Sequence, residues 1–218
     1  MNFLKKELKE FYSWFFERPH VLLENELKDC ESILDLGCGR HSPISKFKKK
    51  FMTVGVDADE KSIIASKERK IHDSYIVSNV LNVEEKIEPK SFDAVIALDI
   101  IEHLEKKDGL RLLEIMEKLA RKKIILITPN GFLEQKEYYG NPLQQHKSGW
   151  VVEDFEKKGF KVYGINGLKG LKSGHAQPKY SPKILFHIVS DITQLLVVKN
   201  NPKKAFQLLC VKKLTNYV

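Results

Sequence analysis

Short apolar runs alternate along this chain with segments of helical periodicity. Residues 74–78 form a weaker run of the same kind. The strong apolar runs, each typical of a buried parallel strand, span 32–36, 52–57, 92–99 and 123–128. The segments between them with the apolar spacing of crossover helices are 42–50, 61–69 and 108–121. Strands and helices that alternate in this way predict a doubly wound, mostly parallel sheet.

The second half of the chain is less regular. After residue 128 a Pro-Asn-Gly turn opens an irregular segment that ends near Gly149, and loops of that length in a compact domain tend to be functional. An amphipathic helix is expected over 3–16. The later elements that we expect are helices over 150–158 and 182–198 and strands over 160–165 and 205–214. The pattern therefore predicts an α/β, Rossmann-like fold with a seven-stranded sheet, helices on both faces and an N-terminal helical cap.

Composition agrees with a single ordinary globular domain. The chain has 218 residues, of which 42% are hydrophobic, and that suits one domain with one core. The three cysteines are scattered, with neither a CxxC pair nor a pattern of disulfide partners. Acidic residues interrupt the basic N-terminus, and polar residues interrupt the longest apolar stretch, 184–198. We therefore expect a cytoplasmic protein without a signal peptide or membrane insertion.

The chain is basic, with a net charge of +8. Of its 37 basic residues, 32 are lysines, and they are spread from end to end. Lysine lacks the planar fork with which arginine grips phosphates, so a spread of lysines is more typical of a solvated surface than of a nucleic-acid site. The basic loop 169–175 also has no aromatic residues to stack on bases. Nucleic acid is therefore a secondary candidate partner.

A glycine-rich turn follows the first strand directly. Gly37 and Gly39 allow the backbone to turn tightly and to approach a ligand where a Cβ atom would clash. The second strand ends in Asp57, an acid placed where it can bind both hydroxyls of a ribose. Together these features predict a nucleotide site at the ends of the two strands.

Two cofactors compete for that site. A dinucleotide dehydrogenase needs a third small residue, so that a pyrophosphate can rest on a helix N-terminus, but here Gly39 is followed by Arg40, His41 and Ser42. Asp35, two residues before Gly37, would repel a pyrophosphate. The same carboxylate can hold the cationic amino-acid end of S-adenosylmethionine (SAM). The loop therefore favours SAM over NAD.

Four motifs in order resemble the class I SAM-dependent methyltransferases. They lie at 33–39, 54–57, 91–95 and 98–104, and the resemblance covers roughly residues 29–130. The most similar subgroup has a Glu-His pair after the fourth strand and Thr-Pro-Asn after the fifth. The resemblance implies that Gly37 and Gly39 contact the methionine part of SAM and that Asp57 binds the ribose. Two positions depart from the family pattern: Asn79 stands where an acid is usual, and His41 replaces the third loop glycine.

The resemblance divides the chain into three expected parts. These are an N-terminal helical cap over 1–28, a SAM-binding core over 29–130, and acceptor-side loops with closing strands over 131–218. The residues expected to bind the cofactor are Asp35, Gly37, Cys38, Gly39, Asp57, Ala58, Asn79, Val80, Leu98 and Asp99. Cys38 is read as a small residue that fits the loop and not as a nucleophile.

Methyl transfer is a displacement at an already activated carbon, so the protein mainly aligns the acceptor, and no metal is required. A hydroxyl acceptor would benefit from a general base, for which His103 and His146 are the candidates. Glu102 and His103 are equally compatible with a plain helix start. The segment 130–150 should bind the acceptor. The alternative role of Tyr138, Tyr139 and Trp150 is to pack the loop onto the sheet, and for Trp150 the sequence fits packing as well as binding.

The sequence thus predicts a SAM-dependent methyltransferase. The expected acceptor is an oxygen or nitrogen of a small polar molecule. The His-x-x-Gly-Trp arrangement ending at Trp150 resembles bacterial and archaeal members whose genes lie near sugar or cell-envelope genes. Three alternatives stay open: an RNA methyltransferase that uses the basic surface, a non-catalytic SAM-binding subunit, and, less favoured, an NAD-dependent dehydrogenase.

Overall fold

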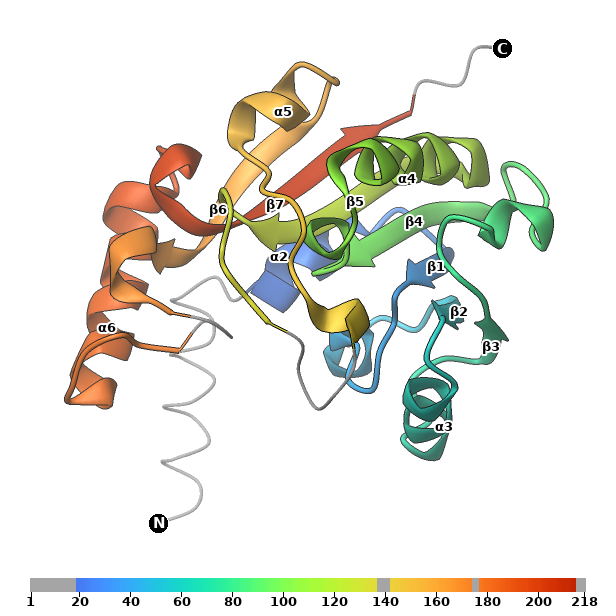
Figure 1. Ribbon diagram of the computed structural model, residues 1–218, viewed down its shortest axis with the longest axis horizontal. Coiled ribbons are helices and arrows are strands. Elements are labelled where there is room, and N and C mark those ends of the chain that lie inside the picture. The colour runs from blue at the N-terminus through green and yellow to red at the C-terminus, as the bar shows by residue number, and fades with distance from the viewer. Residues whose placement is uncertain (1–18, 137–141, 174–176, 215–218) are drawn as a thin grey trace.

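A seven-stranded sheet forms the centre of the molecule (Figure 1). The computed structural model describes residues 19–136, 142–173 and 177–214. The strands are β1 (Ser32–Leu36), β2 (Met52–Asp57), β3 (Ser74–Val77), β4 (Phe92–Leu98), β5 (Ala120–Pro129), β6 (Lys161–Leu168) and β7 (Ala205–Lys213). Their order is β3-β2-β1-β4-β5-β7-β6. Only β7 runs antiparallel to its neighbours β5 and β6, so the predicted mostly parallel, Rossmann-like sheet is confirmed.

The central strands are buried because both faces of the sheet are covered. All five residues of β1 are buried, and successive residues alternate between two cores. Leu34 belongs to the core on one face and Ile33 to the core on the other. This double burial explains why these strands are continuous apolar runs in the sequence.

Five α-helices of the described residues pack around the sheet. They are α2 (Pro19–Glu26), α3 (Glu60–Glu68), α4 (Lys106–Leu119), α5 (Val152–Glu156) and α6 (Lys183–Thr193). The helices α4 and α5 cover one face, whereas α2 contributes Leu23 and Leu27 to the core on the other (Figure 1). The remaining short turns are 3₁₀ segments at Pro43–Lys46, Val83–Glu85, Ile101–His103, Pro142–Gln144, Lys169–Leu171 and Pro202–Lys204, and a π segment at Gln194–Val198.

The prediction of a crossover helix over 42–50 is wrong. Only the 3₁₀ turn Pro43–Lys46 forms there, and Phe47 is already extended. The backbone N–H groups of Lys48 and Lys49 donate to a carboxylate oxygen of Glu24 in α2, at 2.6 and 2.8 Å, and not to the helical carbonyls. A tertiary partner therefore takes the donors on which a helix would depend.

Other expected elements differ mainly in length. The helix predicted over 150–158 is a single turn, Val152–Glu156, and the strand predicted over 160–165 continues to Leu168. The helix predicted over 182–198 ends as α6 at Thr193 and passes into the π segment. The helix expected over 3–16, with most of the expected cap, lies outside the described residues. None of the helices within 19–136, 142–173 and 177–214 is long and apolar enough to span a membrane.

Candidate active site

The glycine loop after β1 adopts backbone conformations that require glycine. Gly37 has φ +72° and Gly39 has φ +55°. The N–H groups of Gly37 and Cys38 donate to the carbonyl of Val56 at 2.8 and 2.9 Å, which fixes the loop to the end of β2. A Cβ atom on Gly37 would lie 2.1 Å from Cδ1 of Ile100, whereas a Cβ on Gly39 would meet nothing within 4 Å. The loop therefore leaves open space beside Gly39, where a ligand can approach the backbone.

A cavity of about 220 Å³ lies against this loop. It opens between the loop and the carboxyl ends of β4 and β5, where open α/β sheets place their ligands. Its lining residues are Asp35, Gly37, Cys38, Gly39, His41, Ser42, Pro43, Leu98, Asp99 and Ile127. The structure thus gathers six of the ten predicted cofactor residues around one cavity. The other four, Asp57, Ala58, Asn79 and Val80, do not line it.

Asp35 is buried in the cavity wall with partners that the sequence analysis did not find. Its side chain is only 2% exposed, and its Oδ2 accepts a hydrogen bond from Ser42 Oγ at 2.6 Å. The same oxygen lies 3.0 Å from Nε2 of His72, which is fully buried. Within the described residues, Nδ1 of His72 has no hydrogen-bond partner. A neutral ring with its hydrogen on Nε2 leaves only a lone pair unsatisfied there, which costs less than a buried N–H group.

Asp57 holds the loop and the following helix together. Its Oδ2 accepts from the Gly39 N–H and its Oδ1 from the Asp59 N–H, both at 2.8 Å. Burial raises the pKa of Asp57, and the two backbone donors act in the opposite direction. Each carboxylate oxygen can accept a second hydrogen bond, so these contacts leave acceptor capacity for ribose hydroxyls.

The residues expected beside the adenine are less well organised. Asn79 is exposed, and its Oδ1 accepts from the Leu81 N–H at 2.9 Å. Val80 belongs to the hydrophobic core, and Ala58 is exposed beyond the end of β2. Burial raises the pKa of the Cys38 thiol, which keeps it protonated and unreactive.

Asp99 lies where the cavity meets the segment after β4. Its backbone has φ +55°, and its Oδ1 accepts from Nε2 of Gln207 at 2.7 Å. Asp99 is exposed as a whole residue, but desolvation of its carboxyl group by the surrounding protein raises its pKa to about 6. The chain thus places a second carboxylate beside Asp35 at the carboxyl edge of the sheet.

Glu102 lies in the 3₁₀ turn after β4 and is nearly fully buried. Its Oε2 accepts from Thr128 Oγ1, near the end of β5, at 3.0 Å. Its backbone carbonyl accepts from the N–H groups of Lys147 and Ser148 at 2.8 and 3.1 Å, which ties the acceptor-side segment to this turn. Burial raises the pKa of Glu102 well above its usual range, and the nearby charge of Asp99 adds to the effect.

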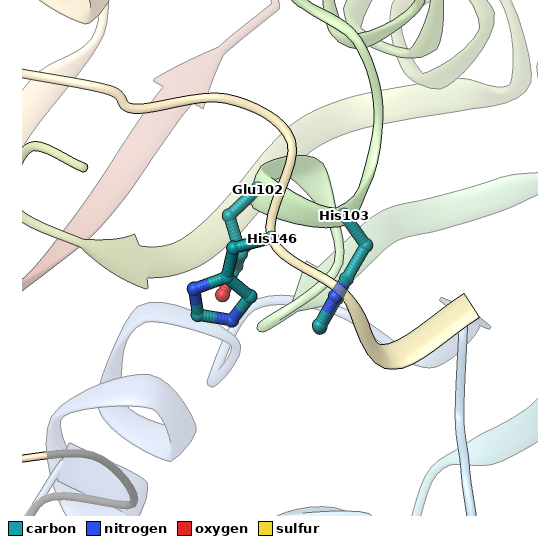
Figure 2. Close-up of side chains that lie close together, drawn as sticks. All are labelled: Glu102, His103 and His146. Carbon is teal, nitrogen blue, oxygen red and sulfur yellow. The ribbon is translucent and has the colours of Figure 1, made fainter. Parts of the chain in front are cut away.

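His103 and His146 meet Glu102 from two different segments (Figure 2). The two imidazole rings pack edge to face with centroids 4.7 Å apart. Nδ1 of His103 lies 3.2 Å from the Gln145 carbonyl, and Nδ1 of His146 lies 2.6 Å from the Leu133 carbonyl. One ligand atom from each of the three residues lies within 4.8 Å of the others. Burial lowers the pKa of His103 to about 4, and the neighbouring His146 contributes.

Trp150 packs in the core. Its side chain is fully buried, its Nε1 donates to Ser148 Oγ at 2.9 Å, and its ring lies against Phe155. The Lys106 ammonium sits 3.6 Å from the ring centroid. Tyr138 and Tyr139 lie outside the described residues.

The functional residues missed from the sequence are His72, Thr128 and Gln207. The Thr-Pro-Asn tripeptide at the end of β5 was a signal for Thr128, because it formed part of the motif set. His72 and Gln207 have no comparable signal, since 37 and 108 positions separate them from their partners Asp35 and Asp99. Only the folded sheet brings these side chains to their carboxylate partners.

Comparison with known proteins finds similarity to methyltransferases. The model of a family described as "Methyltransferase domain" matches residues 34–127. An uncharacterised protein of Methanocaldococcus jannaschii is 27% identical over 185 residues, which cover 84% of this chain and 78% of that protein. A ubiquinone biosynthesis O-methyltransferase of Rickettsia bellii is 25% identical, over 92% of this chain and 83% of that protein.

A solved structure shares the fold. The crystal structure of a SAM-dependent methyltransferase from Archaeoglobus fulgidus superposes with a TM-score of 0.57 and 16% identity. The match covers 94% of this chain and 99% of that one. The similarity therefore extends over the whole sheet, beyond the residues that the family model matches.

Proposed function

We propose that this SAM-dependent methyltransferase methylates an oxygen or nitrogen of a small polar molecule, such as a sugar-type or cell-envelope metabolite. The observation that carries this proposal is the position of Asp99. This residue lines the cavity beside the glycine loop, and its charge acts on Glu102 in the adjoining cluster of polar side chains. A cofactor pocket and a polar acceptor pocket would thus share a wall.

The cofactor side would be held by the loop and its supports. The open space beside Gly39 fits a ligand against the backbone, and the remaining lone pairs of Asp57 suit ribose hydroxyls. Asp35 and Asp99 place negative charge around the cavity, which suits a cationic ligand better than a pyrophosphate. Cys38 and Leu98 complete the lining, while Ala58, Asn79 and Val80 would border the adenine.

SAM would supply a methyl group bound to a positively charged sulfur. The acceptor atom would form a bond to the methyl carbon and lose its proton, while the sulfur would keep the electron pair of the broken C–S bond. The residues of this chain align the acceptor and exclude water. His103 and His146 would serve that task, because a buried carboxyl group and two imidazole rings close together offer both donors and acceptors to a hydroxyl. The tie between Glu102 and residues 147–148 positions this group against the sheet.

The proposal is tested with labelled SAM. The protein is incubated with methyl-labelled SAM and an extract of cells from its source, and the extract is then separated into small molecules, RNA and protein. We expect label in the small-molecule fraction. Label in the RNA fraction that ribonuclease releases would favour an RNA methyltransferase, the alternative suggested by the net charge of +8. Label in no fraction would contradict both the small-molecule and the RNA assignments.

A pair of histidine variants locates the acceptor side. His146→Ala should slow transfer at least about 100-fold, the range of a positioned acid–base or orienting group, while binding of S-adenosylhomocysteine (SAH) stays near normal. His187→Ala is the matched control, because His187 is exposed on α6, away from the cavity lining. Weakened SAH binding in His146→Ala would move this residue to the cofactor side.

A further inference from the structure

The two histidines beside Glu102 are held in the state that metal ligands need. Each Nδ1 faces a backbone carbonyl, Gln145 for His103 and Leu133 for His146, and a carbonyl oxygen can only accept. In a neutral ring with this contact the hydrogen is on Nδ1 and the lone pair is on Nε2. Metal-binding histidines are oriented in the same way, since the second ring nitrogen donates to a carbonyl or carboxylate.

The carboxylate of the cluster is supported in a similar way. Glu102 Oε2 accepts from Thr128 Oγ1, which fixes the side chain and leaves Oε1 as the second oxygen of the group. The backbone around Glu102 and His103 is fixed by the 3₁₀ turn Ile101–His103, and the segment that carries His146 is tied to that turn through the Glu102 carbonyl. Side chains from two chain segments, each held by hydrogen bonds, thus lie close together (Figure 2).

The cluster also has a second carboxyl group nearby, and neither carboxyl group has an ion-pair partner in the described parts of the chain. Glu102 is nearly fully buried, and Asp99 lies close enough for its charge to act on it. Two carboxylates that share a site repel each other, and a buried charge is costly unless it is paired or coordinates a metal.

An acid–base role alone does not explain this arrangement. A general base needs one oriented imidazole, whereas here two lie edge to face beside a buried glutamate. The ligand atoms of Glu102, His103 and His146 lie within 4.8 Å of one another. Ligands about 2.0–2.2 Å from a common ion are about 3–3.5 Å apart, so small side-chain rotations would close the shell.

We propose that Glu102, His103 and His146 bind a divalent transition-metal ion. The mixed set of imidazole nitrogens and carboxylate oxygens suits Mn²⁺, Fe²⁺, Co²⁺ or Zn²⁺ better than Mg²⁺ or Ca²⁺, which prefer oxygen ligands alone. Three protein ligands leave coordination positions free for water or a substrate, as in metal sites that act on substrates.

The catalytic role of this metal site rests on the proposed function. A metal ion in this cluster would bind an acceptor hydroxyl and lower its pKa, so that the O–H proton passes to water before the oxygen forms its bond to the methyl carbon. The sulfur keeps the C–S electron pair, and no oxidant or reductant is needed. The acceptor class that fits such a site is a small molecule with a hydroxyl group, and not an amine.

Direct metal binding tests the site. The full chain, stripped with a chelator, is titrated with Mn²⁺, with Zn²⁺ and with Mg²⁺ by calorimetry, and with Co²⁺ by visible absorption. We expect one ion per chain, tighter binding of Mn²⁺ and Zn²⁺ than of Mg²⁺, and Co²⁺ bands typical of nitrogen and oxygen ligands. Glu102→Gln and His146→Gln should each weaken binding by about 100-fold. Thermal unfolding of the metal-free variants checks that they are folded. If His146→Gln does not fold, the near-isosteric Glu102→Gln still tests the site.

Matched variants and a second ligand make the outcome specific. Glu105→Gln and His187→Gln change exposed residues of the same types and should bind the ion like the unmodified chain. No saturable binding up to about 1 mM ion, or equal binding by Glu102→Gln, would overturn the metal site. SAH binding by the metal-free protein is measured in parallel. If it is retained, a negative metal result refutes the metal site alone, whereas its loss would count against the proposed function.

Discussion

At the scale of single residues, the contact between Asp35 and His72 holds a carboxylate of the cavity wall in place. A buried carboxylate is costly unless hydrogen-bond donors satisfy it, and here Ser42 and His72 both contact Oδ2. His72 reaches Asp35 from the segment before β3, beside Gly55, where a Cβ atom would lie 3.0 Å from its Nδ1. The absence of a side chain at Gly55 therefore makes room for the histidine that orients Asp35.

A double-mutant cycle tests this pairing. His72→Leu should lower the free energy of unfolding by about 3 kcal/mol, because it leaves a buried carboxylate with one partner fewer. Asp35→Asn removes that charge, so the double variant should be more stable than the two single losses predict, with a coupling of about 1–2 kcal/mol. Urea unfolding measures all four proteins. Strictly additive losses would show that the two side chains do not stabilise each other.

The sequence predicted the part of the site that is contiguous. Asp35, Gly37 and Gly39 lie within five positions, and their backbone needs and charge were readable from the local pattern. His103 and His146 were selected as chemically suitable, but their meeting at Glu102 depends on the path of the segment after β5. The same holds for His72, Thr128 and Gln207, whose contacts arise from tertiary packing.

At the scale of elements, the long crossover helix was the most predictable and α4 confirms it. The apolar spacing over 108–121 predicted a helix, and α4 spans Lys106–Leu119 with one face buried. Gly109 in its first turns is unfavourable by propensity alone. The structure explains it, because a Cβ atom there would lie 2.4 Å from Cζ2 of the buried Trp150.

Gly109→Ala is therefore expected to destabilise the protein, although alanine is the better helix former. Propensity would favour alanine by about 1 kcal/mol, but overpacking against a fixed aromatic ring costs about 1–3 kcal/mol. We expect a net loss of about 1 kcal/mol in denaturant unfolding. Gly170→Ala is the control, since a Cβ there meets nothing within 4 Å and the change should be within about 0.5 kcal/mol. A more stable Gly109→Ala protein would show that Trp150 moves aside freely.

Short elements were harder to predict, for physical reasons. The segment 42–50 has apolar residues at helical spacing, but Glu24 of α2 captures the N–H groups that a helix would use. The single turn α5 is fixed by Trp150 and Phe155 in the core more than by its own five residues. Tertiary contacts thus decide these elements, whereas the strands are decided by burial on both faces.

At the scale of the whole molecule, the sheet order places the site. The chain turns from β1 to β2 in one direction and from β4 to β5 in the other, so the carboxyl ends of β1 and β4 face a crevice between the two halves. The cavity lies there, lined from the glycine loop and from the ends of β4 and β5. The alternation of strands and helices was enough to predict this location. The partners of the buried carboxylates were not predictable, because they come from all over the chain.

The most direct test of the central claim is a thermal unfolding titration with SAH, with NAD in parallel. At about 100 times the dissociation constant, a ligand that binds only the folded state stabilises it by about 2.7 kcal/mol, which raises the Tm of a chain this size by about 5–10 °C. The account predicts that shift with SAH, none with NAD, and the loss of most of it in Asp57→Ala. Asp73→Ala, which also removes an aspartate that accepts a backbone N–H, should keep the shift. A shift with NAD and none with SAH would contradict the account.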